Sequence, residues 1–396
     1  MKIRSATTQK TLSEKFREID RVVPILAVLL AVYGAFAVAS AQQYLGTPRY
    51  LIIQIVADVL GAALMLMLSV IDLEAAMKRL AVPFFAVSVV LLLLTLVFGH
   101  GEGNRAWIDL PILPVNVQPS ELVKVLFILS FGYHLGRCRA EINKPKTFFF
   151  LLLHGGVIMG LVALQGDLGS ALVFAFAFLV MLFSAGLSLF YFLGMGAVVV
   201  AASPFLWEML SDYQKKRILV GFNPESDPLD KGYQVICSKN AIAGGGLFGT
   251  GYMNGLISQN PAKSALPARH TDFIFSVIAE ELGFFGVLIL VLLLFALIFR
   301  ILHNARGASD RYGSYFCVGA VAILLFQSLE NIGMCIGLLP VIGLTLPFIS
   351  YGGSSVLSVF LLMGVVLSVS RKEPDTQRLT GERHKLHRRR KGHGAR

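Results

Sequence analysis

The stretch PARHTDFIFSVIAEELGFFGVLILVLLLFALIFR occupies residues 267–300, and its apolar run from residue 273 onward decides the fold. A helix that crosses the hydrocarbon core of a bilayer needs about 20 mostly apolar residues, and this run is longer than that. The run therefore predicts a membrane-spanning helix. It also contains two adjacent acids, Glu280 and Glu281, and Asp272 directly precedes it. Carboxylates at such positions call for an explanation because they are costly in an apolar setting.

Similar apolar runs recur along the whole chain, which has 396 residues, of which 55% are hydrophobic and only 15% charged. With a mean hydropathy of +0.70, its apolar surface exceeds what one water-soluble core can bury. The runs cover residues 22–41, 50–70, 80–99, 118–136, 147–164, 168–186, 188–207, 273–300, 313–335 and 344–370. The sequence therefore predicts an all-α, polytopic integral membrane protein with about ten transmembrane helices.

Lys and Arg gather in alternate short connections between these runs, and basic residues are retained on the cytoplasmic side of a membrane. The pattern predicts that both termini are cytoplasmic: a segment 1–21, then the membrane domain 22–370, then a basic tail 371–396. The tail contributes +7 of the formal net charge of +11. Next to a final span, such a run favours contact with membrane lipids over nucleic acid.

The longest connection, residues 208–272, lies between the seventh and eighth predicted spans, and the same orientation makes it extracytoplasmic. Its length and polarity favour a functional loop. It contains DYQKKRILVGFNPESDPLDKGYQV (212–235) and AIAGGGLFGTGY (241–252). The glycine cluster fits either a flexible hairpin or a backbone that approaches a phosphate closely and offers N–H donors.

Polar residues beside or within the predicted spans form a set that indicates a site, because ionisable groups at this depth are costly. The stretch NRAWIDLPILPVNVQPSELVK (104–124) supplies Arg105, Trp107, Gln118, Glu121 and Lys124. Glu121 and Lys124 share one helical face and form either a structural salt bridge or a substrate contact. Trp107 fits an interfacial anchor equally well.

Two further stretches belong to this set. LQGDLGSA (164–171) places Asp167 at a helix start, where it is either an N-terminal cap or a site residue. NIGMCIGLLPVIGLTLPFISYGGSS (331–355) contains Ser350 among prolines and paired glycines, which is typical of an interrupted helix that lines a cavity. The four cysteines are scattered without metal-ligand spacing, so they predict no metal site.

Together these stretches resemble the SEDS family (shape, elongation, division and sporulation), the polytopic peptidoglycan glycosyltransferases represented by RodA and FtsW. Their order and spacing agree from about residue 20 to 370, and DYQKKRI, NIGM and GTGYMNGLISQ are more similar to RodA. The chain departs from the family pattern at Gly166, Thr250 and Ala268, where the family has proline, lysine and glutamate. The missing lysine and glutamate leave two loop contacts of the family without a counterpart.

The resemblance implies an enzyme of the bacterial inner membrane that polymerises lipid II into glycan strands for cell elongation and shape, releasing undecaprenyl pyrophosphate. Asp272 is then the general base, which takes the proton of the attacking hydroxyl. Arg105 and Arg217 lead the candidates for phosphate contact, with Lys124, Lys239 and Arg269 as further ones. A divalent cation, Mg²⁺ or Mn²⁺, is compatible with Asp272 and pyrophosphate, although no ligand spacing demands it. The expected partner is a class B penicillin-binding protein.

Several alternatives stay open from the sequence. Asp272 next to Thr271 also fits a helix cap, although the neighbouring His270 and the family motif favour catalysis. Glu281 is expected to face a cavity and to have a buried cationic partner, with a purely structural role as the alternative. A lipid-linked precursor flippase or a non-catalytic scaffold of a cell-wall synthase complex remains as a different function; a flippase favours internal repeats, which the two halves do not show convincingly.

Overall fold

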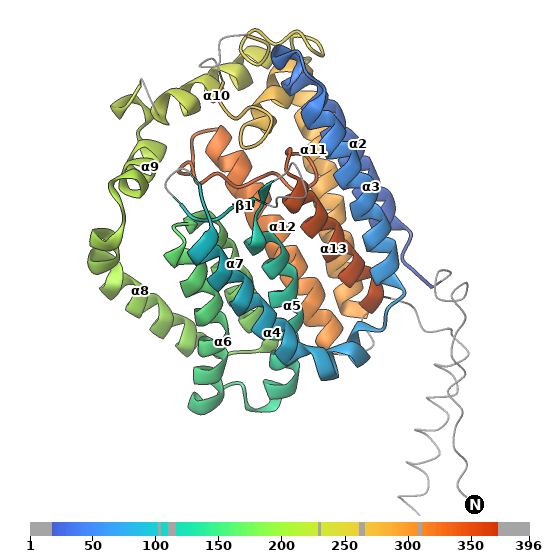
Figure 1. Ribbon diagram of the computed structural model, residues 1–396, viewed down its shortest axis with the longest axis vertical. Coiled ribbons are helices and arrows are strands. Elements are labelled where there is room, and N and C mark those ends of the chain that lie inside the picture. The colour runs from blue at the N-terminus through green and yellow to red at the C-terminus, as the bar shows by residue number, and fades with distance from the viewer. Residues whose placement is uncertain are drawn as a thin grey trace, which may run out of the picture.

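The protein is a bundle of long helices in the computed structural model, which describes residues 18–101, 104–109, 116–228, 231–260, 266–307 and 311–370 (Figure 1). Its elements are α2 (Val22–Ala41), η1 (Gln43–Leu45), α3 (Arg49–Ser69), α4 (Leu73–Phe98), β1 (Ile108–Asp109), β2 (Asn116–Val117), α5 (Pro119–Cys138), η2 (Arg139–Glu141), α6 (Pro145–Leu164), α7 (Leu168–Ala185), α8 (Leu189–Met209), α9 (Asp212–Phe222), η3 (Pro224–Ser226), α10 (Lys231–Gly245), α11 (Ile274–Gly307), α12 (Arg311–Cys335) and α13 (Gly353–Val369). The two-residue strands pair antiparallel in one hairpin.

The all-α, multi-pass prediction is confirmed, since each of the ten predicted spans overlaps one long helix. Among the described residues, eight helices are long and apolar enough to cross a membrane. The other two are α5, whose buried face carries polar and charged residues, and α13, which is apolar but 17 residues long. Local signals set several helix starts: Asp72 and Asp167 cap α4 and α7 through their side chains, and Pro119 and Pro145 open α5 and α6.

The tenth span begins later than predicted. The sequence predicted a span from residue 344, but helix α13 begins at Gly353, and residues 338–352 form an irregular segment, which we call the re-entrant segment. Pro340 and Pro347 explain the difference, because proline lacks the N–H that a helix interior needs. The segment is buried in protein, with Phe348 and Ile349 almost inaccessible. Such irregular backbone is tolerated at membrane depth when protein surrounds it.

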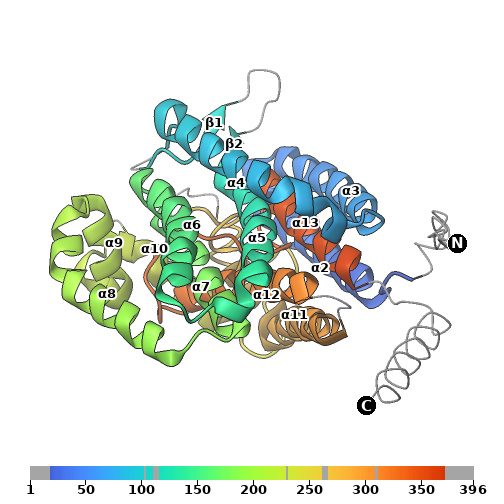
Figure 2. The same ribbon diagram turned by 90° about the horizontal axis from the view of Figure 1, so that it is seen from below.

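Helix α12 lies at the centre of the bundle and α8 at its edge. Of the spanning part of α12, 72% is buried, whereas no residue of α8 is buried. Helix α13 packs against α3 on the side opposite α8, and both views show this arrangement (Figures 1 and 2). The polar face of α5 packs against α12 and α13, so Glu121 and Lys124 point into the bundle.

The connection between α8 and α11 is largely helical. It contains α9 and α10, and α9 begins with a capping box between Ser211 and Gln214. The glycine-rich turn that follows α10 pairs with α11 where that helix is interrupted at Gly283. The backbone N–H groups of Thr250 and Gly251 donate to the carbonyls of Glu280 and Glu281 at 2.9 and 3.1 Å.

Candidate functional site

Asp272 lies in the turn before α11, at the point where α9, α12 and the re-entrant segment meet. Its side chain is partly buried, and this burial raises the pKa of Asp272 to about 6, against the lowering effect of the Arg217 charge and of Thr271. Gly343 lies between Asp272 and Arg217: a Cβ at that glycine would be 3.2 Å from Asp272 Oδ2 and 3.4 Å from a terminal nitrogen of Arg217. Glycine there allows the carboxylate and the guanidinium to approach each other.

The turn around Asp272 is held through its backbone. Ser350 Oγ donates to the carbonyl of Thr271 at 2.7 Å and accepts from the N–H of Leu346. The N–H of Tyr351 donates to the carbonyl of His270 at 2.9 Å. The Asp272 carboxylate itself makes no capping hydrogen bond to a backbone N–H in the part of the chain that the structure describes. This arrangement disfavours the helix-cap interpretation and leaves the carboxylate available for chemistry.

His270 is packed between two tyrosines. Its ring lies 4.4 Å from that of Tyr50 and 5.7 Å from that of Tyr351, measured between centroids. Burial and the neighbouring Arg269 lower the pKa of His270 to about 4, so the ring is neutral near pH 7. Its buried Nδ1 has no hydrogen-bond partner among the described residues. His270 therefore brings an uncharged polar group, rather than a cation, to this side of the site.

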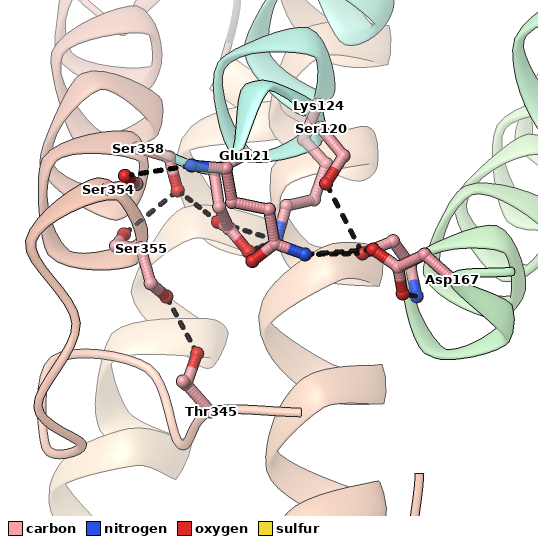
Figure 3. Close-up of polar contacts among 10 residues, drawn as sticks. Ser120, Glu121, Lys124, Asp167, Thr345, Ser354, Ser355 and Ser358 are labelled. Carbon is pink, nitrogen blue, oxygen red and sulfur yellow. Dashed lines mark hydrogen bonds and ion pairs between the residues drawn. The ribbon is translucent and has the colours of Figure 1, made fainter. Parts of the chain in front are cut away.

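A second polar cluster lies at the start of α5, beside α7 and α13 (Figure 3). Gln118 Nε2 donates to Asp167 Oδ2 at 2.8 Å, while the other oxygen of Asp167 caps α7. Lys124 Nζ lies 2.8 Å from the carboxylate of Glu121, and Ser358 Oγ donates to the same carboxylate at 2.7 Å. Glu121 and Lys124 are both almost fully buried. Asp167 caps α7 and also lines a cavity, so its role as a site residue stays a prediction.

Two adjoining cavities connect these clusters. The smaller, of about 240 Å³, is lined by both Asp167 and Arg217. The larger, of about 1230 Å³, lies between α6, α8 and the start of α9, and Arg105 lines it. Asn104 and Gln214 border both. The walls are mostly apolar and include cationic and amide side chains, which suits a molecule that has a lipid tail and an anionic head.

Three further predicted site residues, Trp107, Lys239 and Arg269, do not line these two cavities. Trp107 pairs with His100 through a backbone bridge and is partly buried. Lys239 is exposed on α10, with its aliphatic stem beside Gly337. Arg269 does not fit a phosphate contact: it is fully buried, donates to the carbonyls of Leu266, Ser258 and Asn260, and stacks on Tyr44.

Among the described residues Glu281 has no cationic partner, contrary to the prediction. Its carboxylate accepts hydrogen bonds from Ser40 Oγ, Met253 N–H, Ser258 Oγ and Gln259 Nε2. The adjacent Glu280 accepts from the N–H groups of residues 257 and 258. Both acids therefore attach the loop after α10 to α11. Glu281 also borders a separate apolar cavity of about 320 Å³.

Glu330, an acid inside the span of α12, was not predicted as a site residue from the sequence. It is 2% exposed and lies within electrostatic range of Asp272 and Arg217. The signal was present, since an acid in an apolar span marks a site, but only the fold brings it beside Asp272. Where the structure describes the chain, no three His, Cys, Asp or Glu side chains form a metal-binding group. A divalent cation therefore stays a prediction, with Asp272 as its candidate ligand.

The fold and site define a multi-pass membrane protein in which a partly buried carboxylate lies beside an arginine that lines a cavity. Residues 20–375 match the cell cycle protein family of FtsW, RodA and SpoVE, and the chain belongs to that family. It is 37% identical to the peptidoglycan glycosyltransferase MrdB of Escherichia coli K12, over 91% of this chain and 95% of that one. It is 36% identical to a probable peptidoglycan glycosyltransferase FtsW of Trichlorobacter lovleyi, over 90% and 94% of the two chains.

Two solved structures have a fold similar to that of this chain. A chain in a structure titled as the structural coordination of polymerization and crosslinking by a peptidoglycan synthase complex superposes with a TM-score of 0.76 at 33% identity. The match covers 89% of this chain and 98% of that one. The rod shape determining protein RodA of Thermus thermophilus superposes with a TM-score of 0.66 at 30% identity, covering 90% and 98% of the two chains.

Proposed function

We propose that the protein is a peptidoglycan glycosyltransferase that polymerises lipid II on the extracytoplasmic face of the bacterial inner membrane. The 4-hydroxyl of one disaccharide attacks the anomeric carbon of another, the bond to the pyrophosphate breaks, and undecaprenyl pyrophosphate leaves. The observation that carries the proposal is the position of Asp272, a partly buried carboxylate beside Arg217, which lines the smaller of the two adjoining cavities. The names of the relatives support the same activity.

Named residues can carry out proton transfer and charge stabilisation, and the cavity walls can bind lipid. Asp272 takes the proton of the attacking hydroxyl, and its raised pKa makes it a better base than an exposed aspartate while it remains mostly ionised near pH 7. Arg217, and Arg105 in the larger cavity, stabilise the charge that develops on the pyrophosphate. A divalent cation held at Asp272 would supply further positive charge. The apolar cavity walls receive polyprenyl chain.

The setting of the reaction is part of the proposal. Both termini are cytoplasmic, and α9 and α10 lie outside the cell membrane with the mouth of the site. The partner is a class B penicillin-binding protein, which would crosslink the strands that this chain polymerises; the relationship to a chain of a peptidoglycan synthase complex supports an assembly of this kind. The RodA-like motifs favour a function in cell elongation and shape over division.

The test is polymerisation of labelled lipid II by the purified protein and its Asp272→Asn variant, with the penicillin-binding partner present. Asparagine has the same size but cannot accept the proton, so we expect a loss of about 10²–10⁴-fold in rate with folding retained. Because the base must be ionised, the wild-type rate should fall as the pH drops below about 6.

Glu208→Gln serves as the matched control, because it neutralises an 80% exposed carboxylate on α8 and should leave the rate unchanged. Polymerisation by Asp272→Asn at the wild-type rate would refute the assignment of the base. Wild-type translocation of lipid II across vesicles without polymer would indicate a flippase instead, and neither activity would indicate a scaffold.

A further inference from the structure

The two adjoining cavities share part of their lining. Six residues line both of them: Asn104, Gly166, Leu168, Leu172, Gln214 and Ile218. Only Asn104 and Gln214 of this set have polar side chains. We call these two amides the polar waist, because they lie where the larger, mostly apolar cavity meets the smaller one. The proposed reaction does not yet use either of them.

An arginine lies on each side of the polar waist. Arg105 lines only the larger cavity, and Arg217 lines only the smaller one. Arg105 directly follows Asn104, and Arg217 lies three residues after Gln214 on α9. Residues three apart in a helix share one face, so Gln214 and Arg217 point to the same side of α9. Two segments that are far apart in the chain therefore each supply one amide and one cation.

Both amides have unused hydrogen-bonding capacity among the described residues. Gln214 Oε1 accepts from the N–H of Ser211 in the capping box, and Nε2 makes one long bond of 3.3 Å to the carbonyl of Gly166. The second N–H of that nitrogen has no partner in this part of the chain. The Asn104 side chain makes no hydrogen bond to another described residue, and its oxygen is buried. Because buried polar groups are normally paired, the polar waist suits a polar ligand.

The acids of this region do not line the polar waist. Asp167 lines the smaller cavity, but its two carboxylate oxygens accept from Gln118 Nε2 and from the N–H of Ser170. Asp272 lies beside Arg217 and lines neither cavity. The polar waist thus offers neutral donors with an arginine on either side. Such a set of donors fits a ligand group that carries two adjacent negative charges.

We propose that the polar waist binds the pyrophosphate of a polyprenyl-linked glycan, with Arg105 and Arg217 on its two sides. The inference rests on the proposed function, and it gives the substrate a direction. The polyprenyl chain lies in the larger cavity, and the sugar lies on the Arg217 side, in the smaller cavity. The anomeric carbon, which is joined to the pyrophosphate, is then next to the arginine that lies beside Asp272. The two amides are binding residues, because they donate to phosphate oxygens and make or break no covalent bond.

Gln214→Glu tests the polar waist with little disturbance of the fold. Glutamate has the same size and is preferred at this position of a capping box, so it should still accept from Ser211. It removes the N–H donor and adds a negative charge beside the pyrophosphate. We expect the Kd of farnesyl pyrophosphate to rise at least about tenfold, because like charges in contact strongly oppose binding. The measurement is isothermal titration calorimetry of the purified protein, with EDTA present so that no divalent cation contributes.

Asn104→Asp is a second, independent variant with the same change from amide to carboxylate, and it should raise the same Kd. It keeps the test decisive if Gln214→Glu does not fold. Farnesol provides the matched ligand, because it has the same tail without phosphates, and both variants should bind it as wild type does. Asn240→Asp provides the matched protein: it makes the same change at an exposed position of α10 that lines neither cavity, and it should leave both Kd values unchanged.

A wild-type Kd for farnesyl pyrophosphate in the folded variants would overturn the proposal. An equal loss of farnesol binding would do the same, since the amides would then maintain the cavity rather than bind phosphate. So would an Asn240→Asp protein that loses as much farnesyl pyrophosphate binding as Gln214→Glu.

The binding measurement and the polymerisation assay can fail independently. If wild type polymerises lipid II but the variants bind farnesyl pyrophosphate normally, the proposed function stands and the assignment of the polar waist fails. If wild type makes no glycan while the variants lose this binding, the proposed function fails and the waist remains a polyprenyl pyrophosphate site. In active enzyme, Gln214→Glu should raise the KM for lipid II more than it lowers kcat, because the pyrophosphate is bound before as well as during the reaction.

Discussion

Asn331 holds Asp272 in place through its side-chain amide, which donates a 2.7 Å hydrogen bond to the Asp272 backbone carbonyl. The same nitrogen donates to the carbonyl of Leu344 at 2.8 Å. Asn331 is fully buried, so water does not compete for either bond. One amide on α12 thus fixes the turn before α11 and the re-entrant segment relative to each other, and through them Asp272 and Gly343.

Asn331→Ala should reduce both stability and polymerisation. Two buried carbonyls lose their donor, and an unsatisfied buried group costs about 1–3 kcal/mol. The measurement is the thermal midpoint of unfolding together with the polymerisation rate per folded molecule. Ser328→Ala is the control, because its hydroxyl is buried on the same helix without a partner among the described residues. A normal rate per folded molecule in Asn331→Ala would show that Asp272 does not depend on this amide for its position.

Two ion pairs with the same spacing should respond very differently to mutation. Glu121 and Lys124 are buried, and removing one partner of a buried pair costs about 3–5 kcal/mol because the other charge is left unpaired. Glu141 and Lys144 have the same i, i+3 spacing and a similar distance of 2.7 Å, but both are exposed.

Lys124→Met should therefore lower the thermal midpoint strongly, whereas Lys144→Met should leave it nearly unchanged. Thermal unfolding of both purified variants under identical detergent conditions makes the comparison. Equal effects of the two substitutions would mean that the α5 pair is not isolated from water in the native protein.

Gly283→Ala should destabilise the protein through the interruption of α11. Gly283 has φ = 63°, and a Cβ there would overlap the backbone nitrogen of Gly249. The unfavourable backbone conformation alone costs about 1–3 kcal/mol. Gly156→Ala on α6 is the matched control: nothing lies within 4 Å of the added methyl, and alanine favours helix. A thermal midpoint for Gly283→Ala at or above that of Gly156→Ala would contradict the observed pairing.

The proposed orientation is testable with two reporters. A tag fused after Arg396 should be cytoplasmic, and one inserted near Asp227 should be extracytoplasmic. The reason is that Lys and Arg gather in every second connection and in the C-terminal tail, and basic segments are retained on the cytoplasmic side. Accessibility to a membrane-impermeant reagent in intact cells distinguishes the sides. Three spans are predicted between the two tags, which places the tags on opposite sides of the membrane. Two tags on one side would mean that this part of the chain crosses the membrane an even number of times.

The spans were predictable because each depends on a local property, a run of apolar residues of sufficient length. The start of α13 was not, since residues 344–352 are as apolar as a span but carry Pro347 and fill an interior position. A segment buried in protein and a segment buried in lipid are equally apolar, so hydropathy alone does not distinguish them. The helices α9 and α10 were missed for the opposite reason, because their polar sequence resembles that of a loop.

Three of the predicted polar residues, Arg105, Asp167 and Arg217, line the two cavities. Acids and arginines near spans are rarely retained without a partner or a function, which is why they could be selected from the sequence. Their pairings were harder to predict. The partners of Glu281 come from residues 40 and 253–259, which lie far away along the chain or in a loop whose path the sequence does not specify. Glu330 was missed because its significance depends on Asp272, 58 positions earlier, and on Arg217 in a third element.

The interruption of α11 has a consequence for hydrogen exchange. Four backbone hydrogen bonds join the glycine-rich turn to the helix; in two of them the amides of Phe284 and Phe285 donate to Gly246 and Leu247 at 2.9 and 3.3 Å. Amides within an unbroken spanning helix are protected by the helix itself, whereas these two are protected only while the turn after α10 stays attached. The exchange rates of these two amides therefore measure how often the turn detaches. Deuterium uptake at Phe284 and Phe285 increases with each detachment, even when every helix remains intact.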